Sequence, residues 1–432
     1  MKARKAEMNI VKMKKMETSE KDEKSSVSRK WMAVAFAAVL VLFCVAGVII
    51  PDRDYSPQEN RFLTQWPALS RRNLFNGEYS RKLEKYLTDQ FPLRDAWISL
   101  KAICQKLSGQ KENNDVYFAA DDYLIGKPLP WDPLIVRRNL DCALALSEKG
   151  YETALMVIPM ASEILRDKLP AQAYEPEQAA LLDKLKQEAG DMFIDLRPAL
   201  WTEAEAGRQL YFRTDHHWTT NGAYEAYNAY ARWLGLEPAP REAFAQKVVT
   251  EDFYGTLWSK NSLPGIPADR IVIYEPAESG QAYEIEFFDG SASWKSASMY
   301  QPEYLEQKDK YAYFLGQNRP IVVIRKNNAS TVASTMAANE SAEIAASVNE
   351  VAETASGAGK LLIFKDSYAH SLAPFLAQHF DEIHLVDLRY YKQDPIAYME
   401  EHGIKRVLLL YNTDIFGTER SISQIGAYLA RH

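Results

Sequence analysis

The sequence predicts an α/β domain, built on a parallel sheet with helices on both faces, that follows a single membrane-spanning helix. Three continuous apolar runs near the C-terminus alternate with helical segments, which is the pattern of parallel strands buried on both faces. A charge-free run of 20 residues, Trp31–Ile50, lies near the N-terminus. At 1.5 Å rise per residue this run is just long enough to cross roughly 30 Å of hydrocarbon.

The charge before this run predicts its orientation. Residues 1–30 contain ten Lys or Arg and five Asp or Glu, a net charge of +5. Because positive flanks stay in the cytoplasm, we expect residues 1–30 to be a cytoplasmic tail, residues 31–50 the transmembrane helix, and the rest an extracytoplasmic domain of a single-pass protein of the cell membrane. The alternative is a cleaved signal peptide, but the apolar run is long for one and no clear cleavage site precedes Pro51.

The remaining elements follow in order along the chain. Residues 51–75 are irregular and interrupted by proline, so we expect a juxtamembrane stalk, and we expect residues 76–432 to form the extracytoplasmic domain. This domain begins with two amphipathic helices, from Asn76 and from Pro92, and a hairpin over 116–126. Further helices are expected at 133–149, 177–189, 221–234, 368–379, 395–402 and 421–430, and strands at 154–159, 192–196, 361–364, 382–388 and 406–412.

Two segments of this domain have a different composition. Residues 248–325 carry short alternating runs separated by Gly and Pro, which predicts a β-rich insertion. Residues 326–358 are rich in Ala, Ser, Thr, Asn and Glu and lack aromatic residues, so they are interpreted as a low-complexity excursion that buries no core.

Charge and cysteine content exclude several classes of protein. Since the whole chain carries −7 and the first 30 residues +5, the chain beyond them carries −12, which argues against nucleic acid as a partner. Cys104 and Cys142 are the cysteines beyond the span, and they could form one bridge or remain two buried thiols. The sequence has no glycine-rich phosphate loop, no His-Glu-x-x-His motif and no metal-binding cysteine pair, so we expect neither a cofactor nor a metal site.

The run from Tyr211 to Gly222 concentrates groups that are suited to catalysis. In an extended or turn conformation Asp215 and His217 point the same way, so the carboxylate can orient the imidazole. Ser367 follows an apolar strand and opens a helix, at the carboxyl edge of the sheet where sites form. The free N–H groups of that helix could bind an oxyanion. Ser367, His217 and Asp215 are therefore candidates for the nucleophile, the general base and its orienting group.

Other interpretations of these patterns remain open. A serine at such a position is commonly a helix N-cap. His370, three residues after Ser367, is a weaker candidate for the base, because its ring would point along the helix flank. The amide of Asn412, which ends the third apolar strand, could donate to the oxyanion. Arg389 could do so too, although it is more simply a strand-end loop residue. Trp218 is a candidate for substrate binding.

The run TDHHW at 214–218 resembles the signature of the bacterial DHHW proteins, which are similar to the alginate O-acetyltransferases and have the fold of the SGNH (GDSL-like) hydrolases. The resemblance implies a three-layer α/β/α domain and assigns Asp215, His217 and Ser367 to the catalytic positions, with Asn412 as the oxyanion asparagine. It covers most of the chain beyond the span and extends to the blocks at 84–97, 116–125, 254–260, 313–320 and 361–371.

The expected function is serine-dependent transfer of an acetyl group to a hydroxyl of a cell-surface polysaccharide. The resemblance also implies a partner, a multi-spanning membrane acyltransferase that delivers acyl groups across the membrane. A carbohydrate acetyl esterase would use the same residues with water as the acceptor. A non-catalytic scaffold or binding protein of envelope polysaccharide assembly is a further alternative, because Lys365 stands where the family usually has glycine and could crowd the oxyanion hole.

Overall fold

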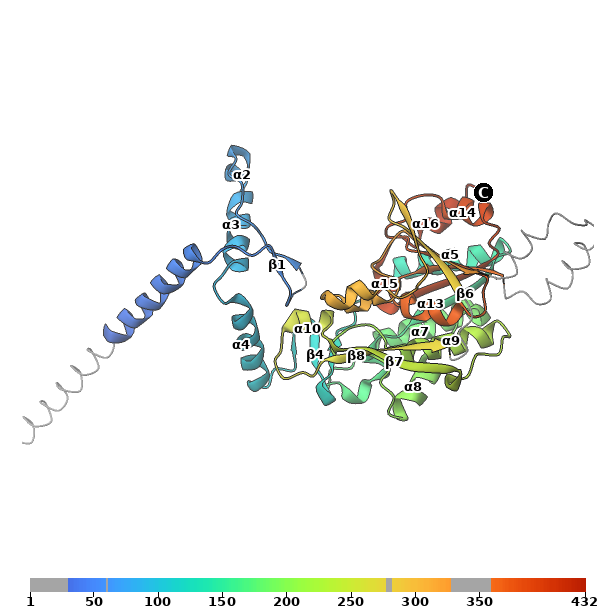
Figure 1. The fold of residues 1–432 in the computed structure, drawn as a ribbon, viewed down its shortest axis with the longest axis horizontal. Helices are drawn as coiled ribbons and strands as arrows, with labels where there is room; N and C mark the ends of the chain where they lie inside the picture. Colours follow the sequence, from blue (N-terminus) through green and yellow to red (C-terminus); the bar gives the residue numbers. More distant parts are fainter. Residues whose placement is uncertain (1–29, 60, 277–281, 328–358) are drawn as a thin grey trace, which may run out of the picture. The chain divides into compact units, whose positions relative to one another are not determined.

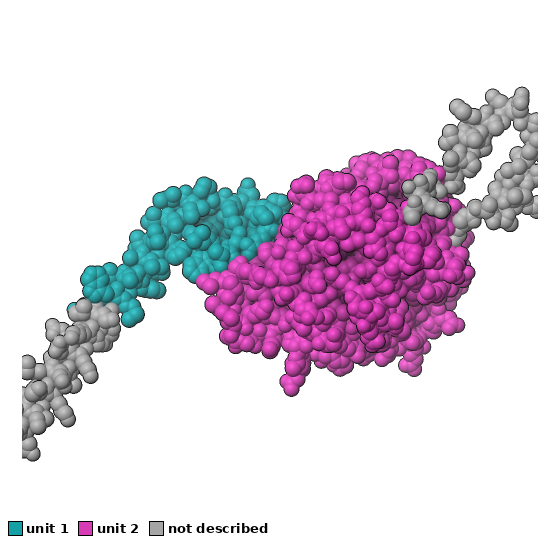
Figure 2. All heavy atoms as spheres, turned by 60° about the horizontal axis from the view of Figure 1, so that its bottom comes forward, with its two compact units in different colours: residues 1–98 teal, residues 99–432 magenta. Residues whose placement is uncertain are grey.

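The computed structural model describes residues 30–59, 61–276, 282–327 and 359–432. They form two compact units, residues 1–98 and residues 99–432 (Figure 2). The expected cytoplasmic tail up to residue 29 and the expected low-complexity excursion from residue 328 onward lie outside the described residues. The two units are described in turn.

The first unit contains the apolar helix and the segment that follows it. The helix Lys30–Ile49 has a mean hydropathy of 2.9 and is long and apolar enough to cross a membrane, and its length and composition are equally compatible with a signal sequence. The expected stalk is not irregular throughout. It holds a short hairpin of β1 (Tyr55–Ser56) and β2 (Arg61–Phe62) and the helix α2 (Arg71–Phe75), and helix α3 (Glu78–Asp89) follows.

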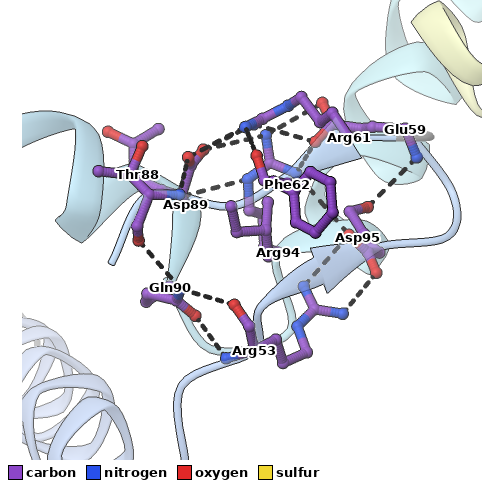
Figure 3. Close-up of polar contacts among 12 residues, drawn as sticks. Arg53, Glu59, Arg61, Phe62, Thr88, Asp89, Gln90, Arg94 and Asp95 are labelled. Carbon is purple, nitrogen blue, oxygen red and sulfur yellow. Dashed lines mark hydrogen bonds and ion pairs between the residues drawn. The ribbon is translucent and has the colours of Figure 1, made fainter. Parts of the chain in front are cut away.

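Ion pairs hold this small unit together (Figure 3). Asp89 at the end of α3 accepts two hydrogen bonds from Arg61, at 2.6 and 3.0 Å, and one from Thr64 N at 2.9 Å. The Arg61 guanidinium therefore keeps the pKa of the Asp89 carboxyl well below its usual range. Arg94 at the start of the next helix pairs with Glu59. These contacts tie the β1–β2 hairpin to the end of α3 and to the start of helix α4 (Arg94–Leu107).

The second unit, whose ribbon is drawn in Figure 1, is built on a seven-stranded mixed sheet, and the strand order is β10-β9-β11-β13-β12-β14-β6. The last four strands are parallel to one another, and the neighbouring pairs β10–β9, β9–β11 and β11–β13 are antiparallel. The strands are β6 (Glu152–Ile158), β9 (Ala282–Phe288), β10 (Ser293–Ser296), β11 (Ile321–Asn327), β12 (Lys360–Lys365), β13 (Glu382–Val386) and β14 (Arg406–Asn412). Three strands of the expected β-rich segment thus extend the main sheet, while β7 (Phe244–Phe253) and β8 (Asp269–Pro276) pair separately.

Helices cover both faces of the sheet, as the apolar strands predicted. Along β12, Leu361 and Ile363 pack into one core cluster, and Leu362 and Phe364 pack into the other. The first cluster is covered by α9 (Thr220–Trp233) and α13 (Ala369–Leu376). The second is covered by α5 (Pro133–Glu148), α7 (Glu177–Ala189), α14 (Pro395–Glu401) and α16 (Gln424–Leu429). The result is the expected three-layer arrangement.

Several local predictions need correction. The expected strand at 192–196 is reduced to one bridge between Phe193 and Leu155, because a 3-10 turn occupies Gly190–Met192. The helices α8 (Arg197–Glu205) and α15 (Thr413–Thr418) were not expected. Cys104 and Cys142 do not form a bridge, and they are not both buried. Cys142 is a buried free thiol, and Cys104 is an exposed one.

Candidate active site

Ser367 lies in the turn between β12, which ends at Lys365, and α13, which begins at Ala369. The turn is fixed by Asp366, whose carboxylate accepts a hydrogen bond from Tyr368 N at 2.9 Å. The N-cap position of α13 is Tyr368, so Ser367 does not cap the helix, and its partly exposed hydroxyl faces His217 instead.

The structure brings Ser367, His217 and Asp215 together in one chain of hydrogen bonds. His217 Nε2 is 2.7 Å from Ser367 Oγ, and His217 Nδ1 is 2.6 Å from Asp215 Oδ1. An ionised carboxylate can only accept, so Nδ1 carries the ring proton and Nε2 accepts from the serine hydroxyl. This is the tautomer that a general base needs. Asp215 and His217 are buried, so the hydrogen bonds between these residues are shielded from water.

Asp215 is held at both carboxylate oxygens. Oδ1 accepts from His217 N at 2.9 Å, and Oδ2 accepts from Thr256 N at 2.8 Å and Thr256 Oγ1 at 3.0 Å. Burial opposes ionisation, but the neighbouring imidazoles of His216 and His217 outweigh it, so the pKa of Asp215 is held well below its usual range. Sequence reasoning gave no role to Thr256, although it lies in the 254–260 block that carries the family resemblance.

The ring of His217 is clamped by aromatic side chains. Tyr311, in the 3-10 helix Lys310–Tyr313, stacks on it with 3.7 Å between ring centroids and an interplanar angle of 8°. The Tyr311 hydroxyl donates to Ser367 O at 3.3 Å and contacts Ser371 Oγ at 3.1 Å. Tyr311 therefore links the base to the turn that carries the nucleophile. Tyr311 lies two residues before the 313–320 block of the resemblance and is not part of it, so the sequence did not identify this residue.

Trp218 does not have the substrate-binding role that the sequence predicted. Its side chain is fully buried, and its indole N–H donates to Ser371 Oγ at 2.9 Å and Tyr368 O at 3.2 Å. It packs against the ring of Tyr368 at 5.2 Å between centroids. Trp218 therefore lies behind the site, bonded to Tyr368 and to Ser371 of α13, and its ring offers no exposed surface to a substrate.

Asn412 and Arg389 are also engaged elsewhere. The side-chain amide of Asn412 donates to Asp366 Oδ2 at 2.8 Å, and its oxygen caps α15 by accepting from Ile415 N at 3.0 Å. Arg389 forms two hydrogen bonds to Asp387, at 2.9 and 2.7 Å. The position of both residues at strand ends correctly placed them at the carboxyl edge of the sheet. It could not predict that the carboxylates of Asp366 and Asp387 would accept their side-chain hydrogen bonds.

Lys365 is fully buried, and its ammonium group is held on the sheet side of α13. Nζ is 2.6 Å from His370 Nε2, donates to Asn318 Oδ1 at 3.1 Å, and lies 3.7 Å from Asp387 Oδ2. Burial lowers the pKa of Lys365 to about 8. The side chain that could have crowded the oxyanion hole is thus bound by these partners. His370, the weaker candidate for the base, is the partner of this lysine.

Asp215, His216 and His217 offer ligand atoms within 4.8 Å of one another, the spacing of a possible metal site. His217 uses both ring nitrogens in the hydrogen bonds to Asp215 and Ser367, and His216 Nδ1 is 2.7 Å from Thr256 Oγ1. A metal ion here would have to displace these bonds. The donor set therefore fits proton transfer between a hydroxyl and an imidazole better than metal coordination.

Comparisons with known proteins agree with this architecture. The model of the SGNH hydrolase-like domain of the acetyltransferase AlgX matches residues 138–261. A DHHW family protein from Eubacterium siraeum is 21% identical, with a TM-score of 0.55 over 73% of this chain and 96% of its own. Bacillus cereus PatB1 is 19% identical, with a TM-score of 0.55 over 70% of this chain and 97% of its own. A PatB1 structure with a sulfonyl adduct is also 19% identical, with a TM-score of 0.54 over 71% and 98%. No curated protein matches the sequence.

The chain therefore has an SGNH-like α/β fold, and it resembles the DHHW and AlgX-type proteins as its TDHHW run indicated. The mixed sheet and the covering helices are those expected of this fold class.

Proposed function

We propose that this protein is an extracytoplasmic serine O-acyltransferase that moves an acetyl group onto a hydroxyl of a cell-surface polysaccharide. The observation that carries the proposal is the hydrogen-bonded chain from Ser367 through His217 to Asp215. A serine whose hydroxyl donates to a buried, oriented imidazole is an activated nucleophile, and acyl transfer is the chemistry that such a group performs.

In the first step Ser367 Oγ attacks the carbonyl carbon of the acyl donor while His217 Nε2 takes the hydroxyl proton. The tetrahedral intermediate collapses when His217 returns this proton to the leaving group, and an acetyl-serine remains. The acceptor hydroxyl then gives its proton to His217 and attacks the acetyl carbon. Collapse releases the sugar ester, and the proton returns to Ser367. Asp215 stays ionised throughout and stabilises the imidazolium.

The oxyanion of both intermediates needs donors close to Ser367. The main-chain N–H of Ser367 supplies one, together with the positive end of the α13 helix dipole, because the N–H groups of Tyr368, Ala369 and His370 already bond to Asp366 and Ser367. Since the Asn412 amide donates to Asp366, we assign it a supporting role in fixing the Asp366–Ser367 turn.

The cellular setting is part of the proposal. The apolar helix Lys30–Ile49, with its basic N-terminal flank, anchors the chain in the cell membrane with the catalytic unit outside. An acyl donor must then reach the outer face, which a multi-spanning membrane acyltransferase as partner supplies. Hydrolysis of the acetyl-serine by water gives esterase activity as the alternative outcome of the same intermediate.

The test uses the full chain, purified in detergent, with p-nitrophenyl acetate as the acyl donor. Wild type should release p-nitrophenol, and a sulfonyl fluoride should label Ser367 and stop the reaction. Ser367→Ala and His217→Ala should each abolish most of the activity, because members of such a unit do not contribute additively. Full activity in a folded Ser367→Ala variant would refute the serine mechanism and leave the binding or scaffold role as the better hypothesis.

A further inference from the structure

A pocket of about 390 Å³ lies in the second unit, beside the end of β14. Thr413 and Asp414, the first two residues of α15, form one wall. The loop that contains Trp131, after β5 (Leu124–Gly126), forms another wall, and the segment 175–181 at the start of α7 completes the pocket. No step of the proposed reaction uses these residues.

The pocket opens at the same edge of the sheet as the nucleophile. Strands β12 and β14 are parallel neighbours, so the residues that follow them emerge side by side. Asn412 donates to Asp366 through both its main-chain N–H, at 2.7 Å, and its side-chain amide, at 2.8 Å. Lys365 pairs with Leu410, so Ser367 is level with Asn412 and Thr413 is one residue further along; with strands ~4.8 Å apart and a rise of ~3.3 Å per residue, Ser367 and Thr413 emerge on the order of 6 Å apart. A short oligosaccharide spans that distance.

The lining has the groups that a sugar ring requires. Trp131 is partly exposed, and its indole N–H donates to Glu177 O at 3.1 Å, which fixes the orientation of the ring. A fixed aromatic face of this kind packs against the apolar face of a pyranose. Thr413 is 3% exposed, and its hydroxyl oxygen has no hydrogen-bond partner among the described residues. A buried polar atom without a partner indicates that the wall retains an unused hydrogen-bonding group.

The charge of the lining selects among sugars. Lys127, the basic residue of the lining, is paired with Glu112 at 3.0 Å. The acidic residues of the lining are Asp115, Glu175, Glu177 and Asp414. Uronate residues would be repelled by this surplus of carboxylates, whereas an ammonium group would be attracted. The net charge of −12 beyond the N-terminal 30 residues acts in the same direction over longer range.

We propose that this pocket binds an amino sugar of the acceptor polysaccharide and so positions a neighbouring sugar hydroxyl at Ser367. The identity of the bound molecule as the acceptor rests on the proposed acyltransferase function. Trp131 supplies the stacking surface, and Asp414 pairs with the sugar ammonium group. Asp414 is suited to this because Oδ1 already accepts from Leu129 N at 3.0 Å, which holds the carboxylate in place.

The test is calorimetric titration of the full chain in detergent with three probes: a β-1,4-linked glucosamine tetrasaccharide, its N-acetylated counterpart and a galacturonate tetrasaccharide. The glucosamine probe should bind about tenfold or more tightly than the N-acetylated one, and the galacturonate probe should not bind. Trp131→Ala should weaken the binding of both the glucosamine tetrasaccharide and its N-acetylated counterpart. Asp414→Asn, which keeps the acceptor for Leu129 N, should weaken only the charged probe.

Trp294→Ala is the matched control, because Trp294 is an exposed tryptophan on β10 that does not line the pocket. It should bind the probes as wild type does. Ser367→Ala should also bind them normally, so a failure of the catalytic proposal is distinguishable from a failure of this one. Galacturonate binding as tight as glucosamine binding, or unchanged glucosamine binding in both Trp131→Ala and Asp414→Asn, would overturn the proposal.

Discussion

A single methyl group added at Gly255 should disable the proposed base without touching it. Gly255 has φ −85° and ψ −162°, a conformation that alanine adopts freely, so Gly255→Ala introduces no backbone strain. The new Cβ would lie 2.6 Å from Asp215 Cγ and closer still to Cβ and Oδ2 of the same residue. Ordinary contact begins at 3.4 Å, so the carboxylate or the loop must move by at least 0.8 Å.

Asp215 cannot give way cheaply, because four hydrogen bonds from His217 and Thr256 hold its carboxylate. Overpacking of this kind costs about 1–3 kcal/mol of stability. A misplacement of about 1 Å in a catalytic group costs on the order of 10² in rate, and complete loss of the orienting carboxylate about 10⁴. We therefore expect kcat for p-nitrophenyl acetate to fall by ~10² to 10⁴ in the variant.

The assay measures kcat below the melting temperature of the variant, so that only folded protein is compared. Gly426→Ala is the control: its methyl would meet Cys142 Sγ at 3.1 Å, in the core under α16. That variant should lose stability and keep its kcat. Wild-type kcat in folded Gly255→Ala would refute the argument that the position of Asp215 controls the base.

Four further outcomes are expected. His216→Ala should keep activity within about tenfold of wild type, whereas His217→Ala should be nearly inactive; the reverse order, measured with p-nitrophenyl acetate, would reassign the base. Trp218→Phe should cost about 1–2 kcal/mol in urea unfolding, because the indole N–H bonds are lost, with KM little changed. Burial raises the pKa of Asp414 from its ordinary value near 3.8 to about 6, so the wild type loses stability as pH rises through this range. Asp414→Asn should therefore raise the free energy of unfolding by about 3 kcal/mol at pH 8 and leave it unchanged near pH 4; an equal gain at both pH values would show that the charge is not responsible. A membrane-impermeant maleimide should label the exposed Cys104 in intact cells stripped of their wall, and labelling only after lysis would reverse the orientation.

The parts of this fold that could be predicted from the sequence are those fixed by local pattern. The run at 361–364 is apolar without interruption, and the runs at 382–388 and 406–412 are apolar over most of their length, so strands buried on both faces could be predicted for all three. The run at 192–196 has the same local character. Its failure to extend the sheet depends on the turn at Gly190–Met192, and no residue within the run reports that turn.

Pairing between distant segments could not be predicted in this way. The pattern of β9 and β11 indicates strands but not that they join β13 to extend the main sheet, because register is decided by partners far along the chain. The same limit applies at the site. Residue type and edge position identified Ser367 and the pair Asp215–His217, but they gave no sign of Tyr311, whose ring packs on His217 only in the folded chain.

The position of β14 has a consequence for how the site is assembled. This strand lies between β12 and β6, and its first residue, Arg406, bonds to Glu152 across 254 positions of the sequence. A chain made from its N-terminus at ~5–20 residues per second would leave β6 without its neighbour for roughly 10–50 s. Contacts of such long range form late in folding. The hydrogen bond between His217 and Ser367 itself spans 150 positions, so a growing chain contains the proposed base well before its nucleophile has been made. The proposed catalytic pair is thus incomplete until almost the last strand of the sheet has been made.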